Sequence, residues 1–242
     1  MKFSHLVVTD LTKCTGDQAS VALKLIERYS EPSIADQTAD EFEWLVWMTK
    51  YQDNATQQAI DLHCRSKKAR VIFYTRKPEN DQERSRHVRS FVWCQNEGIE
   101  PEVLITTRLP PGGGFHKKML ESVQECALDE DRRTPAKRRY TEGLYAKRDG
   151  TLYQLYWREN PFESVCDRWD LNYSHTCWSN VKCPTEFAVS KNAWLMTAGK
   201  FSGSTLGERV EGQWEEILKD AITYGGKSNG VVSEAALAGR TG

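Results

Sequence analysis

The sequence predicts an α/β protein: a three-layer, Rossmann-like parallel sheet with a helical insertion after the first strand and an α+β C-terminal extension. Two observations support this class. Between Ala69 and Arg132 the chain alternates between short apolar runs and longer amphipathic ones, which is typical of strands joined by helices. After Arg132 it turns to short aromatic runs separated by turn residues, as in antiparallel hairpins.

The N-terminal part is expected to begin with a buried strand over Phe3–Thr9, ending at Asp10. Helical periodicity follows in three segments, with the apolar residues of each spaced three or four apart. These segments are residues 19–29, 40–51 and 55–65. Because they lie between the first two predicted strands, we expect residues 15–66 or so to form a helical cap within a core domain of residues 1–157.

The middle of the chain is expected to supply the remaining strands of the parallel sheet. Strands are predicted over 70–75, 103–107 and 123–128. A helix over 81–96 separates the first two, with Asn80 or Asp81 as its N-cap and Gly98 after its end.

The last third of the chain is expected to form a second unit, residues 158–242. Just before it, Asp149-Gly150 lies between two runs rich in Leu and Tyr, which predicts a β-hairpin. Residues 158–206 are aromatic-rich and irregular, and a last helix is predicted from Glu208 to Tyr224.

Composition limits the classes of function. The 33 basic and 34 acidic residues give a net charge of −1, so the protein as a whole is not an electrostatic nucleic-acid binder. No apolar run is long enough to span a membrane. Seven cysteines without paired spacing indicate a reducing compartment, so we expect a cytoplasmic protein. The sequence leaves the oligomeric state open.

Chemically useful side chains follow the predicted strands. A carboxylate comes after the first strand, a hydroxyl after the second, lysines before the last and carboxylates after it. Parallel strands present such residues at one edge of a sheet, where ligands bind. Carboxylates prefer Mg²⁺, whereas lysine and threonine can hold phosphoryl oxygens. The residues are Asp10, Thr75, Lys117 or Lys118, Asp129 and Asp131.

This order resembles the haloacid dehalogenase-like phosphohydrolases, and most of all the 3′-phosphatase domain of polynucleotide kinases. The resemblance covers residues 1–157. It implies that Asp10 is the nucleophile that forms an aspartyl phosphate, that Asp10, the Thr12 carbonyl, and Asp129 or Asp131 hold Mg²⁺, and that Thr75 and one lysine bind the phosphoryl group. The expected substrate is a nucleotide or polynucleotide phosphate. Thr12 stands where these phosphatases carry a second Asp, which serves as the general acid and base of the hydrolytic step.

Further substrate contacts are expected from residues close to the strand ends. They are Arg76, Arg108, Gly113 in the loop Gly112–Gly114, and Arg132. The glycines could cradle an anion through bare N–H groups, or the loop could simply be flexible.

A different class of function remains open from the residues alone. The basic run 132–139 and the aromatic C-terminal region suit a non-enzymatic nucleic-acid-binding or assembly protein on the same scaffold. The aromatics could stack bases or pack in the core: Tyr153, Tyr156, Trp157, Trp169, Tyr173, Trp178.

A second metal site is suggested by soft ligands near the C-terminus. A Zn²⁺ ion could be held by Cys166, His175, Cys177 and Cys183. Buried free cysteines, packed as small apolar side chains, are the alternative.

Overall fold

The computed structural model describes most of the first 211 residues. The described residues are 2–14, 16–50, 54–128, 135–147, 149, 151–158, 160–179, 185–188, 193–197 and 204–211. None of the described helices is long and apolar enough to cross a membrane.

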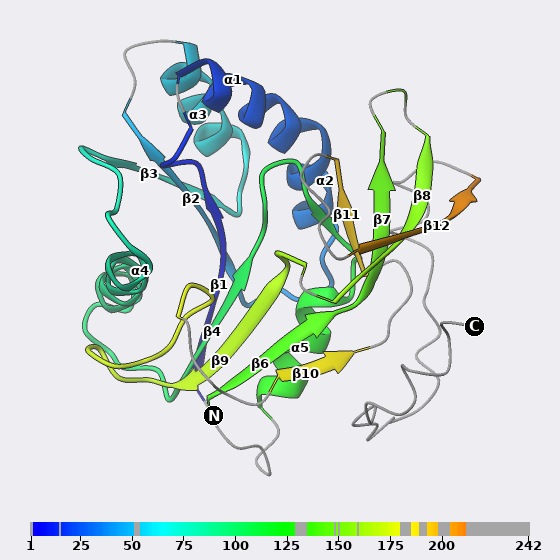
Figure 1. Cartoon of the computed structure of the whole chain (residues 1–242). Coiled ribbons are helices and arrows are strands. Elements are labelled where there is room, and N and C mark those ends of the chain that lie inside the picture. The colour runs from blue at the N-terminus through cyan, green and yellow to red at the C-terminus, as the bar shows by residue number, and fades with distance from the viewer. Residues whose placement is uncertain are drawn as a thin grey trace.

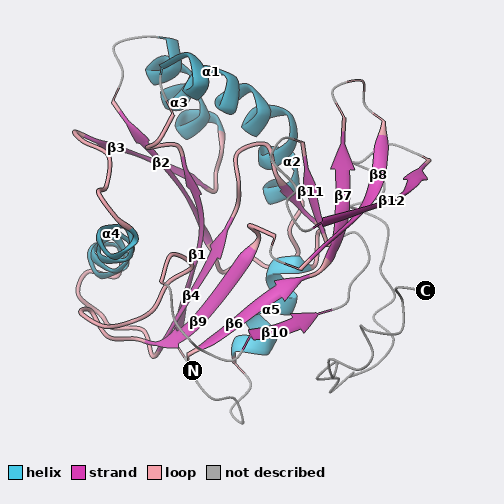
Figure 2. Cartoon of the chain, viewed as in Figure 1, coloured by secondary structure: helices cyan, strands magenta, loops and turns pink. Residues whose placement is uncertain are grey.

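The chain folds as a mixed α/β structure built on two sheets (Figures 1 and 2). The larger sheet has seven strands in the order β10-β6-β9-β4-β1-β2-β3. Their bounds are β1 (Phe3–Asp10), β2 (Glu43–Thr49), β3 (Ala69–Tyr74), β4 (Val103–Arg108), β6 (Ala136–Tyr140), β9 (Glu163–Arg168) and β10 (Thr185–Ala188).

Four neighbouring strands of this sheet are parallel, and the sheet as a whole is mixed. β1 pairs in parallel with β2 and β4, and β2 pairs in parallel with β3. β9 runs antiparallel to both β4 and β6. The prediction of an α/β fold is therefore confirmed, but the prediction of an all-parallel sheet is wrong. The antiparallel strand β9 comes from beyond residue 157, so segments on both sides of the predicted domain boundary share one sheet. The boundary itself stays a prediction.

Helices cover both faces of the larger sheet. On one face, α4 (Asp81–Gln95) packs Val88 and Val92 against Leu6, Val8 and Trp47. The opposite face is covered by α1 (Gly16–Leu25), α3 (Asn54–Arg65) and α5 (Met119–Ala127), whose buried residues join Val7, Trp44 and Ile105. A π-helical turn (Ile26–Ser30) leads from α1 into α2 (Glu31–Ala35). Successive residues of a strand point to opposite faces, so Leu6 and Val8 of β1 belong to the cluster beneath α4 and Val7 to the cluster on the opposite face.

The smaller sheet has five strands in the order β12-β8-β7-β11-β5. Their bounds are β5 (Gly114–Phe115), β7 (Glu142–Ala146), β8 (Leu152–Trp157), β11 (Trp194–Met196) and β12 (Ser204–Val210). β7 and β8 form the predicted hairpin, with the Thr151 N–H donating to Asp149 Oδ1 at 2.9 Å.

Three predicted elements are wrong, each for an identifiable reason. Residues 43–49, expected within a helix, form β2, because a strand buried on both faces is apolar throughout and shows no alternation. Residues 123–127, expected in a strand, belong to α5, whose buried Leu120, Val123 and Cys126 are spaced for a helix. Residues 208–210 lie in β12 rather than in a helix, and the rest of that predicted helix lies outside the described residues. The expected helical cap of residues 15–66 thus includes a strand of the larger sheet.

The other predictions of local structure are confirmed. The strands expected over 3–9, 70–75 and 103–107 correspond to β1, β3 and β4, and the helix expected over 55–65 is α3. The Asn80 side chain caps α4 by accepting the Glu83 N–H at 2.9 Å.

Candidate binding site at the carboxyl end of the parallel strands

The parallel strands place four different residues at their carboxyl ends. These residues are Asp10, Thr49, Tyr74 and Arg108. Asp10 lies opposite Trp47 of β2, and Val8 lies opposite Arg108 of β4. The chain leaves β1 for β2 and β3 on one side, then returns to place β4 on the other side. This change of direction beside β1 is a topological switch point, where open α/β sheets form a crevice.

Asp10 lies at this switch point, and both of its carboxylate oxygens are engaged. Oδ1 accepts hydrogen bonds from the Thr12 N–H at 2.9 Å and from the Thr12 hydroxyl at 2.6 Å. Oδ2 pairs with Arg84 Nε of α4 at 2.8 Å. Asp10 therefore holds the turn after β1 and compensates a buried guanidinium, since the Arg84 side chain is only 3% exposed.

The Asp10 carboxylate also influences its neighbours. Burial, together with the charge of Asp10, raises the pKa of the Tyr74 phenol and of the Cys14 thiol. Tyr74 therefore stays protonated at neutral pH and can donate a hydrogen bond. Its ring contacts that of His87 on α4 with centroids 4.6 Å apart.

Arg108 is a further cation at the switch point. Its guanidinium lies over the ring of Trp178, 5.5 Å from the centroid. Trp178 in turn stacks on Trp47, with centroids 5.2 Å apart and 20° between the planes. Within the described part of the chain, Arg108 makes no ion pair with a carboxylate. It is a half-buried cation resting on two stacked aromatic rings.

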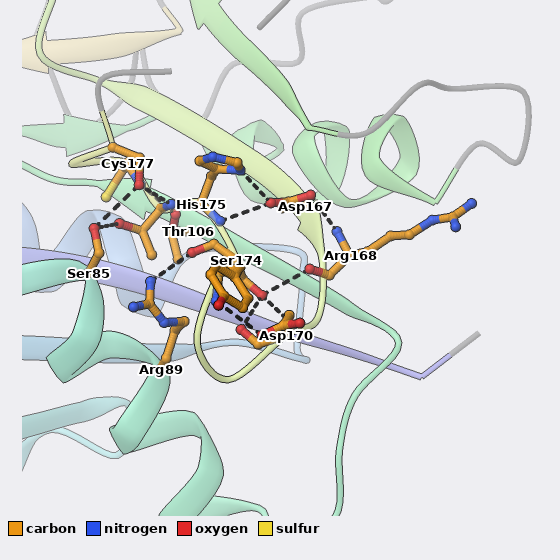
Figure 3. Close-up of polar contacts among 12 residues, drawn as sticks. Ser85, Arg89, Thr106, Asp167, Arg168, Asp170, Ser174, His175 and Cys177 are labelled. Atoms are coloured by element: carbon orange, nitrogen blue, oxygen red, sulfur yellow. Dashed lines mark hydrogen bonds and ion pairs between the residues drawn. The ribbon is translucent and has the colours of Figure 1, made fainter. Parts of the chain in front are cut away.

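Residues 169–179, which follow β9, bring Trp178 to this position. α4 anchors the segment at two points: Arg89 donates to the carbonyls of Leu171 and Ser174 at 2.7 and 2.9 Å, and the Ser85 hydroxyl bonds that of Thr176 at 2.8 Å. Figure 3 shows Arg89 and Ser85 pointing from α4 into this segment.

Two further contacts tie the same segment to the sheet. On β4, the Thr106 hydroxyl accepts the Cys177 N–H at 2.8 Å (Figure 3). At the end of β9, Asp167 Oδ2 accepts both the backbone N–H and the ring Nδ1 of His175, at 2.9 and 2.7 Å. The segment is therefore fixed along its length, and it fixes Trp178 beneath Arg108. No sequence motif marks this arrangement, because its partners come from three distant elements.

The structure does not bring the predicted phosphatase residues together. Asp10 points to the face covered by α4, because it follows Leu6 and Val8 in the alternation of β1. Lys117 and Lys118 precede α5, which covers the opposite face, and the Lys117 carbonyl accepts the Thr38 N–H there. The lysines therefore lie on the wrong side of the sheet for a phosphoryl group on Asp10.

Thr75 and Arg76 are also displaced from Asp10. They follow β3, and β2 lies between β3 and β1, so Thr75 is two strand spacings of about 4.8 Å each from β1. Arg76 pairs with Glu79 and Glu83 at the surface. The Thr12 carbonyl, expected to hold Mg²⁺, accepts the Thr49 hydroxyl at 3.4 Å.

The predicted acidic motif and Arg132 lie outside the described residues. Asp129 and Asp131 belong to this range.

The Gly112–Gly114 loop is packed into the structure rather than open to a ligand. The Gly113 N–H donates to the Pro110 carbonyl at 2.9 Å, and its own carbonyl accepts the Ser30 hydroxyl. A Cβ on Gly113 would lie 2.8 Å from the Phe162 ring. These glycines permit close packing between the two sheets, so the Gly113 amide is not available to an anion.

The predicted zinc ligands do not converge. Cys166 belongs to the core cluster beneath α5, whereas Cys177 belongs to the cluster beneath α4, on the opposite face. His175 is paired with Asp167 and Cys183 lies outside the described residues. Burial raises the pKa of Cys177 to about 12, which disfavours the thiolate that zinc requires. Among the described residues, no group of three or more His, Cys, Asp or Glu side chains is placed to hold a metal ion.

The described part of the basic run is occupied inside the protein. Lys137 and Arg139 both pair with Glu163, and Arg138 lies over the Tyr140 ring at 5.3 Å. Of the aromatics considered for base stacking, Trp157 and Trp178 are buried and Tyr173 is exposed. These residues do not form one cationic and aromatic surface.

No protein-family model and no curated protein matches this chain. Solved structures similar to it include S. aureus TarS residues 1–349, with 14% identity and a TM-score of 0.35 over 61% of this chain. A second is GalNAc-T7 with UDP, GalNAc and Mn²⁺, with 10% identity and a TM-score of 0.34 over 64% of this chain. A third is mannose-1-phosphate geranyltransferase from Thermus thermophilus, with 11% identity and a TM-score of 0.28 over 60% of this chain. This chain spans 35%, 27% and 42% of their respective lengths.

At these TM-scores the similarities do not identify a function for this chain. None of the three is a haloacid dehalogenase-like phosphatase. The separation of Asp10 from the lysines and from Thr75 corrects the expectation from sequence. The resemblance to that superfamily and the Mg²⁺-dependent aspartyl-phosphate chemistry inferred from it are wrong.

Proposed function

We propose that the protein binds a nucleoside diphosphate, or a conjugate of one such as a nucleotide-linked sugar, with the phosphates at the carboxyl ends of β1 and β4. The strand order β3-β2-β1-β4 supports this most strongly, because its change of direction beside β1 forms the kind of crevice where open α/β sheets bind nucleotides.

The charged groups at this reversal of strand order suit an anionic ligand. Arg108 offers a guanidinium that is already held on Trp178, and a planar guanidinium matches two phosphate oxygens at once. The strand-end acceptor, Asp10, is already paired with Thr12 and Arg84, so Arg108 is the charged strand-end group that can meet an anion.

Binding can be measured by isothermal titration with ADP, GDP, UDP, UDP-linked sugars and inorganic pyrophosphate. UDP is the nucleotide present in the similar GalNAc-T7 structure. We expect at least one nucleoside diphosphate to bind more tightly than pyrophosphate, since the base and ribose add contacts. Failure of every compound in the panel to bind would refute the proposal.

The location can be tested by replacing Arg108 with glutamine. Loss of a charge-assisted hydrogen bond costs about 1.5–3 kcal/mol, so the affinity should fall about 10- to 100-fold. Arg70→Gln is the matched control, because Arg70 is an exposed arginine on β3, three strands from β4. Equal losses in the two variants would place the ligand elsewhere.

A further inference from the structure

Among the described residues, two carboxylates at this end of the sheet pair with Arg84: Asp10 Oδ2 with Nε at 2.8 Å, and Asp81 Oδ1, at the start of α4, with Nη1 at 2.7 Å. Thr12 donates twice to Asp10 Oδ1. A divalent ion at Asp10 would have to displace Arg84, whose side chain is 3% exposed and would then face the ion's two positive charges. Mg²⁺ at phosphate sites is held by one or two carboxylates together with the phosphates, and the two described carboxylates here, Asp10 and Asp81, are both paired with Arg84.

Arg108, by contrast, is a cation without a compensating carboxylate in the described chain. β4 holds its backbone beside β1, since the Leu109 N–H donates to the Val8 carbonyl at 2.9 Å. Trp178 holds the guanidinium from below, and the 169–179 segment holds Trp178. A fixed, partly desolvated guanidinium binds phosphate without the conformational entropy cost that a free surface arginine would incur.

We infer that the protein binds the diphosphate of its nucleotide ligand without a bridging divalent cation, and that Arg108 on its Trp178 platform supplies the positive charge. This rests on the proposed nucleotide-binding function and adds how the site neutralises its ligand. It differs from the Mn²⁺-containing GalNAc-T7 structure and from the magnesium site expected from the sequence. The Arg108 guanidinium fits an oxyanion and does not fit a bare metal ion.

The test is titration of UDP and of ADP into the full chain, first in EDTA and then in about 5 mM MgCl₂ or MnCl₂. We expect the dissociation constants to agree within about threefold across the three conditions. In EDTA, Arg108→Gln should weaken binding about 10- to 100-fold, with Arg70→Gln unchanged. Arg108→Lys should lie between them, because lysine keeps the charge but loses the planar fork. MnCl₂ titrated alone should give no saturable binding.

Each alternative result has a distinct meaning. Nucleotide binding that is lost in EDTA and restored by Mg²⁺ or Mn²⁺ would overturn the metal-free inference and leave the proposed function standing. Wild-type affinity in Arg108→Gln, with circular dichroism and melting temperature confirming its fold, would overturn the role of Arg108. Absence of nucleotide binding with and without metal would refute the proposed function itself, and the inference with it.

Discussion

Acidification from pH 8 to pH 5 should destabilise this protein through one buried histidine, His5 of β1. The residue is 3% exposed, and its ring lies in a chain of hydrogen-bonded side chains inside the core. Gln124 Nε2 lies 3.2 Å from His5 Nδ1, and His5 Nε2 lies 2.9 Å from the Thr107 hydroxyl. The Thr107 hydroxyl is in turn hydrogen-bonded to the Ser164 hydroxyl at 2.8 Å. An amide N–H can only donate, so Nδ1 is the acceptor and Nε2 carries the proton. The neutral ring satisfies both neighbours, and a second proton would have no acceptor.

Burial lowers the pKa of His5 from 6.5 to about 3. Between these values the unfolded chain binds a proton that the folded chain does not, so stability is fully present above pH 6.5 and is lost as the pH falls below it. At about 1.4 kcal/mol per pH unit, the 1.5 units between 6.5 and pH 5 cost about 2 kcal/mol. That is a large part of the roughly 5–15 kcal/mol by which native proteins are stable.

Urea unfolding at pH 8, 6.5 and 5 measures this loss when the wild type is compared with His5→Gln. Glutamine stays neutral, so the variant lacks this titration while sharing all the others. The substitution has some cost in the free energy of unfolding at pH 8. From pH 8 to pH 5, the difference in the free energy of unfolding between the wild type and the variant should shift by about 2 kcal/mol in favour of the variant. That corresponds to about 1 M urea for a slope of about 2 kcal/mol/M. A difference that stays constant from pH 8 to pH 5 would refute the reasoning.

Three other outcomes follow from the packing. Arg84→Ala should destabilise the protein by about 3–5 kcal/mol in urea unfolding, because it leaves the largely buried Asp10 carboxylate without its cation. Removing an exposed ion pair should cost under about 1 kcal/mol. Gly143→Ala should lower the free energy of unfolding by about 1–3 kcal/mol or more, because the new Cβ would lie 2.2 Å from the Trp194 ring. A variant as stable as the wild type would contradict this contact. Iodoacetamide labelling of the native protein at pH 8, followed by mass spectrometry, should be fast at the exposed thiols of Cys64 and Cys94 and slow at the buried thiol of Cys177, whose pKa is raised by burial.

Local signals predicted several elements well. The Asn80 cap and the amphipathic run after it predicted α4, and Asp149-Gly150 predicted the β7–β8 hairpin, because a cap and a tight turn depend on a few adjacent residues. The apolar run of β2 gave no such signal. Its residues are buried on both faces, so periodicity could not separate a strand from a helix, and the number of strands between Asp10 and Thr75 was wrong as a result.

The sequence by itself determined the α/β class, the strand that ends at Asp10, and Arg108 as a candidate substrate-binding residue. Only the tertiary structure decided which of the candidate residues meet. Strand order and the alternation of side chains along β1 place Asp10 with Arg84 of α4 and separate it from Lys117 and Lys118. The support of Arg108 by Trp178 joins distant parts of the chain through contacts with α4, β4 and β9. Such contacts depend on how distant segments pack, and no local pattern of residues encodes that packing.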